Sequence, residues 1–111
     1  MVDYAKYMME WLRVMERFAE AEELKTDEEK LYVMMSDTLA SIALYLGARV
    51  YRDENGFFIL LDDLKKLDEY EAIKDLVDDA IEMNRQHFWQ YKHELNIVDE
   101  FKRDMRKRGV R

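Results

Sequence analysis

The segment Thr26–Gly47 constrains this chain most, because it joins a helix start signal, the most apolar stretch and a glycine stop. Thr26 with Glu29 three residues later fits a capping box, and the acids around them favour the positive end of a helix. Five large apolar residues then recur at helical spacing on one face: Leu31, Met35, Leu39, Ile42 and Leu46. The opposite face is also partly apolar, so we predict a helix over residues 27–46 that lies inside a bundle.

A second helix is predicted before this segment, over residues 3–24. Its apolar residues alternate in steps of four and three, and we expect them to face the core: Tyr4, Met8, Trp11, Met15 and Phe18. Met9 falls on the polar side of the same helix.

After Gly47 the pattern changes to that of a β-hairpin over residues 48–61. Asn55-Gly56 supplies the positive φ angles of a tight turn between aromatic and branched flanks. The second strand is apolar on both faces, and a lone two-stranded ribbon is marginal in water. We therefore expect the hairpin to pack on helices or to be extended by a partner. The competing interpretation is an irregular loop.

Residues 62–108 are predicted to be helical. One helix over 69–107 would be about 58 Å long at 1.5 Å per residue, so we favour a break near Leu95–Ile97. The fold prediction is mainly α: a small helical bundle of four to five helices with one β-hairpin inserted after the second helix. At 111 residues we expect a single domain, 1–111.

Composition removes several functional classes. There is no cysteine, so disulfides and thiolate chemistry are absent. No apolar run reaches the roughly 20 residues that span a bilayer, and the first residues lack a signal-peptide pattern. We expect a cytoplasmic protein with no membrane partner.

Catalytic motifs are also missing. Three isolated glycines leave no phosphate-binding loop, and Ser36 and Ser41 have no histidine nearby in sequence. His87 and His93 are six residues apart, about 120° around a helix, so they do not share one metal ion. Asp37 is the acid best placed for burial, and we expect it to face a basic neighbour at the rim of the core. We predict no catalytic residue, metal site or cofactor.

Charge is distributed unevenly. Residues 62–82 hold nine acids and three lysines, a net charge of −6, whereas residues 102–111 hold six bases and one acid, a net charge of +5. We define the acidic stripe as four carboxylates that share one helix face, opposite Ile73: Asp75, Asp78, Asp79 and Glu82. Their spacing of roughly 5–6 Å resembles that of phosphates on a nucleic-acid strand. The stripe is therefore a candidate decoy surface for a basic nucleic-acid-binding protein. The plain alternative is a solvated helix face.

Two further residues complete the candidate partner-binding set. Counting from Ile73, Trp89 falls on the acidic side, where an exposed tryptophan would be a binding anchor. His93 follows one turn later. The alternative for Trp89 is a second helix packed on that side, or a change of helix phase near Asn84.

The sequence thus favours a non-enzymatic protein that binds, and regulates or inhibits, another macromolecule. An alternative is a self-associating structural module, a homodimer formed through the hairpin edge or a methionine-rich helix face. A carboxylate-rich metal enzyme is the third hypothesis. The basic C-terminus suggests at most weak binding to nucleic acid.

Overall fold

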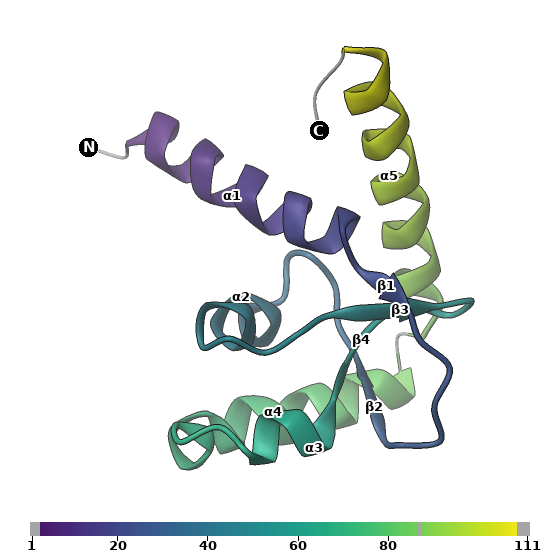
Figure 1. Ribbon diagram of the computed structural model, residues 1–111. Helices are drawn as coiled ribbons and strands as arrows, with labels where there is room; N and C mark the ends of the chain where they lie inside the picture. The colour runs from purple at the N-terminus through teal and green to yellow at the C-terminus, as the bar shows by residue number, and fades with distance from the viewer. Residues whose placement is uncertain (1–2, 87, 109–111) are drawn as a thin grey trace.

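The computed structural model describes residues 3–86 and 88–108, apart from the side chains of Tyr7, Gln86 and residues 88–91. These residues form five helices and a four-stranded mixed sheet (Figure 1). The elements in chain order are α1 (Tyr4–Ala19), β1 (Glu22–Glu23), β2 (Lys30–Tyr32), α2 (Thr38–Tyr45), β3 (Tyr51–Asp53), β4 (Gly56–Leu60), α3 (Leu61–Lys65), α4 (Tyr70–Gln86) and α5 (Phe88–Lys107). The fold is therefore mixed α and β, and the prediction of a bundle with a single hairpin is correct only in part.

The predicted hairpin is confirmed as β3 and β4, which pair antiparallel with Asp53 opposite Gly56. Gly56 has φ 138°, a conformation that a residue with a Cβ rarely adopts. Asn55 does not have a positive φ, so the predicted turn geometry is correct for Gly56 and wrong for Asn55. The hairpin is extended on both sides, because the strand order is β1-β3-β4-β2. Within the chain, β1 and β2 pair with the two edges of the predicted hairpin.

The predicted helix over 27–46 is wrong in its first half. Residues 30–32 form β2, and Leu31 pairs with Ile59 of β4. Thr26 does not cap a helix: its Oγ1 accepts a hydrogen bond from the backbone N–H of Glu28, which makes a local turn. Leu31, Val33 and Met35 are all buried, which is the alternation of a strand. Val33, which the helix prediction placed on the face opposite Leu31 and Met35, therefore lies on the same side of the extended chain as these two residues.

The other boundaries also shift. Helix α1 ends at Ala19 instead of residue 24, because Glu22 and Glu23 pair with β3 as β1. At the other end α4 ends at Gln86 and α5 begins at Phe88. The predicted break near Leu95–Ile97 is therefore wrong, since those residues lie within α5.

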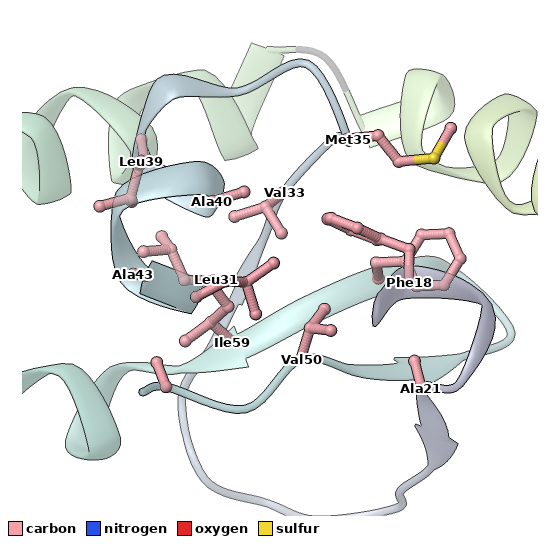
Figure 2. Packing of buried hydrophobic residues seen from close by; sticks show 14 of the residues in the cluster. Phe18, Ala21, Leu31, Val33, Met35, Leu39, Ala40, Ala43, Val50 and Ile59 are labelled. Atoms are coloured by element: carbon pink, nitrogen blue, oxygen red, sulfur yellow. The ribbon is translucent and has the colours of Figure 1, made fainter. Parts of the chain in front are cut away.

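The core lies where α1, α2, α4 and α5 meet one face of the sheet (Figure 2). Phe18 of α1 contacts Phe57 of β4 edge to face, with ring centroids 4.9 Å apart. All five residues of β4 are buried, as expected for a strand that is apolar on both faces.

A polar cluster binds three strands together on the sheet face that carries Phe58. Lys30 of β2 reaches over the ring of Phe58 on β4, 4.7 Å from its centroid, to Asp53 of β3 at 2.8 Å. The Tyr32 hydroxyl donates to the same carboxylate oxygen at 2.6 Å, and the Asn55 N–H donates to the other oxygen at 2.8 Å. Burial alone would raise the pKa of Asp53, but these three hydrogen bonds outweigh it and hold that pKa below its usual value.

Candidate functional site

The acidic stripe exists as the sequence predicted, on the outer side of α4. All four members are exposed, whereas Ile73, Val77 and Ala80 on the opposite side are buried. Glu82 lies 3.8 Å from Arg85 on the same helix, which is a weak surface ion pair. The stripe therefore faces outward, which fits both a binding surface and a solvated face.

Trp89 and His93 do not belong to the helix that carries the stripe. Both lie on α5, and α4 ends before them, so the 100° step counted from Ile73 does not place Trp89 beside the acids. The Trp89 side chain and all of His87 lie outside the described residues. The His93 side chain is exposed.

The structure reveals a surface that the sequence assigned to the core: the N-terminal half of α1. Tyr4, Met8, Trp11 and Leu12 are 73%, 62%, 44% and 38% exposed, whereas Met15 and Phe18 farther along the same helix are 5% and 0% exposed. The prediction that this whole apolar series faces the core is therefore wrong for its first half. We call the segment Tyr4–Leu12 the α1 arm.

The core ends where the anchoring contacts of α1 end. Phe18 packs on Phe57, and the guanidinium of Arg17 donates to the carbonyl oxygens of Leu44 at 3.5 Å and Ala48 at 3.3 Å. These bonds satisfy carbonyls just at and after the end of α2. Beyond them the arm projects away from the sheet and diverges from α5 (Figure 1).

The sequence carries no signal that separates the arm from the buried half of α1. Tyr4, Met8 and Trp11 continue into Met15 and Phe18 with the same helical spacing and the same apolar character.

A pair of carboxyl groups, Asp37 and Glu94, lies where the start of α2 approaches α5. Burial raises the pKa of Asp37, although its Oδ2 accepts a 2.8 Å hydrogen bond from the Met34 N–H. Burial also raises the pKa of Glu94, with nearby His93 opposing and Asp37 reinforcing that shift. The expected basic neighbour of Asp37 is not seen among the described residues, where the Met34 N–H holds its carboxylate and the acid Glu94 lies nearby.

Two hollows are the most relevant concave features. One, of about 590 Å³, separates α1 from the end of α2 and is lined by charged side chains of α1 with Ser41 and Tyr45. The other, of about 310 Å³, lies between α2 and α4 and includes Ser36, Asp37 and Asp79. Neither set of lining residues pairs a nucleophile with a histidine, the arrangement that would activate a serine.

Comparisons with protein-family models, with curated proteins and with solved structures yield no match. Within the described ranges, no three side chains of the His, Cys, Asp and Glu types lie together as a metal-binding group. None of the described helices is both long and apolar enough to cross a bilayer. The largest group of exposed apolar side chains on one described element is that of the α1 arm.

Proposed function

We propose that this protein is a non-enzymatic protein-binding module, and that the α1 arm binds a helical partner with an apolar face. The single observation that carries the proposal is the contrast along α1. One continuous apolar face is buried at Met15 and Phe18 and open to solvent from Leu12 back to Tyr4. Monomeric proteins rarely expose a contiguous cluster of large apolar side chains unless it serves binding.

The composition of the arm supports a protein partner. Tryptophan, tyrosine and methionine are enriched at protein interfaces, and tryptophan and tyrosine are frequent energetic hot spots. At 100° per residue, Tyr4, Met8, Trp11 and Leu12 fall within a sector of about 100°. Such a strip is the form in which one helix packs on another.

A protein with such a surface would regulate its partner by binding to it. A protein of this kind changes its target by covering a surface or by bringing two chains together, and it needs no bound cofactor to do so. The regulatory or inhibitory role expected from the sequence is then a consequence of where the arm binds.

The acidic stripe is the second candidate surface, and its outward position on α4 favours it. Asp75, Asp78, Asp79 and Glu82 would bind a basic surface such as a nucleic-acid groove. This association would weaken steeply with added salt, whereas binding to the apolar arm would not.

A capture experiment separates the two surfaces. Immobilised wild type, a Trp11→Ser variant and a variant with all four stripe acids changed to amides are each incubated with extract of the source cells. Tyr45→Ser is the matched control, because Tyr45 is 89% exposed but lies on α2. Bound proteins are quantified at low and high salt.

If the arm is the binding surface, wild type, the amide variant and Tyr45→Ser should all capture the same partner at high salt. Trp11→Ser should not capture it. All variants should keep the wild-type melting temperature, because the changed side chains lie on the surface. Loss with the amide variant alone would assign binding to the stripe. Equal capture by Trp11→Ser and wild type would refute the role of the arm.

A further inference from the structure

We propose that the partner of the α1 arm is a second copy of this chain, whose own arm packs against it antiparallel around a two-fold axis at Met8. This inference rests on the proposed function, because it names the occupant of the same surface. Antiparallel pairing around Met8 places Tyr4 of each copy opposite Leu12 of the other and brings the two Met8 side chains together.

The spacing of the arm suits pairing with an identical helix. Tyr4, Met8, Trp11 and Met15 recur in steps of four, three and four, which is the spacing of the contact positions in a coiled coil. An isologous interface requires a surface that is complementary to itself. An apolar helix strip meets that requirement, because each copy offers the other the same uncharged face.

Charge favours the arm as the place where two copies meet. The whole chain carries −7, so two copies repel one another over most approaches. Residues 3–13 are neutral, with Asp3 and Glu10 balanced by Lys6 and Arg13. Lys6, Glu10 and Arg13 lie on the side of α1 opposite the apolar strip. The contact strip therefore brings no charge into the interface.

The shape of the molecule selects the antiparallel arrangement. The rest of the protein is attached at the C-terminal end of the arm, and the whole molecule extends 40 × 38 × 24 Å. Parallel arms would place both bodies at the same end, where they would collide. Antiparallel arms of nine residues overlap over about 13 Å and hold the bodies at opposite ends.

The size of the contact predicts a weak dimer. Two aromatic and two aliphatic side chains per copy would bury on the order of 1,000 Å² in total, the lower end of specific interfaces. A dissociation constant on the order of 10 µM is appropriate to such a contact. The dimer should then form and dissociate within an accessible concentration range.

The test measures the mass of the full chain by light scattering after size exclusion, from about 1 to 200 µM. Wild type should shift from its monomer mass of 13.5 kDa to twice that value. Met8→Glu should weaken the dimer at least about tenfold, because it places two carboxylates against each other, and Met8→Lys should do the same with two ammonium groups. An equimolar mixture of the two variants should recover the dimer mass, since a carboxylate of one copy then faces an ammonium group of the other across the axis.

Controls keep folding and surface chemistry separate from pairing. Met8 is exposed, so both variants should retain the wild-type circular dichroism and melting temperature of dilute protein. Tyr45→Glu places the same charge on another exposed site and should leave the dimer unchanged.

A wild type that stays monomeric throughout would overturn this inference, as would a dimer that survives Met8→Glu or a mixture that fails to recover mass. If the monomer still captures another protein through Trp11, the second copy is refuted and the proposed function stands. If neither association occurs, both fail. Arm-dependent binding of the monomer to phosphatidylcholine vesicles would also overturn both, since the occupant would be a lipid surface.

Discussion

Asp53 and Glu94 are both withdrawn from water, yet their surroundings are opposite. Asp53 accepts hydrogen bonds from Lys30, Tyr32 and the Asn55 N–H, and its pKa is lowered. Glu94 has a buried Oε2 that finds no hydrogen-bond partner in the described part of the chain, and its pKa is raised. In the sheet, the buried carboxylate of Asp53 is hydrogen-bonded to residues of another strand, β2. Between α2 and α5, the buried Oε2 of Glu94 has no such partner in the described part of the chain.

The difference shows how to interpret a perturbed carboxyl group in this protein. A raised pKa often accompanies a catalytic acid or base. Here Asp37 is held by the Met34 N–H in the turn before α2, and Glu94 is not among the residues that line the adjacent hollow. The raised pKa of Asp37 comes from burial, and that of Glu94 from burial together with the nearby charge of Asp37.

Removing Asp53 should have the largest effect. Asp53→Ala leaves the half-buried Lys30 ammonium, the Tyr32 hydroxyl and the Asn55 N–H without their shared acceptor. We expect a loss of about 3 kcal/mol in the free energy of unfolding at pH 7, measured with urea. Glu54→Ala, at an exposed neighbour, should change it by less than about 0.5 kcal/mol. A similar small loss for Asp53→Ala would contradict a stabilising role for the cluster.

Lowering the pH should reduce the stabilisation that Asp53 provides. The pKa of Asp53 in the folded protein lies below its ordinary value of 3.8, so its stabilisation is complete above that pH and is lost as pH falls through the folded pKa. The difference in unfolding free energy between wild type and Asp53→Ala should therefore shrink as urea titrations move from pH 5 toward about pH 2. A constant difference over this range would show that the charge of Asp53 is irrelevant.

Tyr32→Phe should have an intermediate effect. The hydroxyl donates at 2.6 Å to Asp53, and burial together with that bond raises the pKa of Tyr32 to about 12. Its removal should cost about 1 kcal/mol while leaving the ring contact with Phe58 in place. Tyr45→Phe, at an exposed tyrosine, serves as the control and should be neutral.

Glu94→Gln should act in the opposite direction. A carboxyl whose folded pKa is raised keeps its proton in the folded state after the unfolded chain has lost it, so stability falls as pH rises above about 4.5. Neutralising Glu94 should therefore stabilise the protein at pH 7 by at most about 1 kcal/mol, because partial exposure to solvent screens the charge. The gain should vanish at pH 4, where wild-type Glu94 is itself protonated. Glu100→Gln on the same helix is the matched control, and a gain that persists at pH 4 would exclude electrostatics as its cause.

The smallest expected effect is the coupling between Asp37 and Glu94. Asp37→Asn keeps an oxygen that can accept from Met34, so it removes the charge and little else. In a double-mutant cycle with Glu94→Gln at pH 7, the combined gain should fall short of the sum by about 0.5 kcal/mol, because each change relieves the same repulsion. Strict additivity would show that the two carboxyl groups do not interact.

Local chemistry made several features predictable from sequence. Asn55-Gly56 located the hairpin, although the turn itself is Glu54-Asn55 and, of these residues, only Gly56 has a positive φ. The acidic stripe was predictable because Asp75, Asp78, Asp79 and Glu82 are separated by helical spacings within one uninterrupted helix. The position of Trp89 relative to the acidic stripe was not predictable, because α4 ends before Trp89 and the 100° step per residue holds only within one helix.

Sequence by itself determined which residues are apolar, where the tight turn lies and which face of α4 carries the acids, because these follow from residue type and short-range geometry. Tertiary structure decided that Lys30–Tyr32 extend the sheet, since strand and helix spacing both fit this short run and only pairing with β4 distinguishes them. It also decided where the core stops along α1. The apolar series from Tyr4 to Phe18 is continuous in sequence, but burial requires another element to pack on it, and none covers the arm within the described chain.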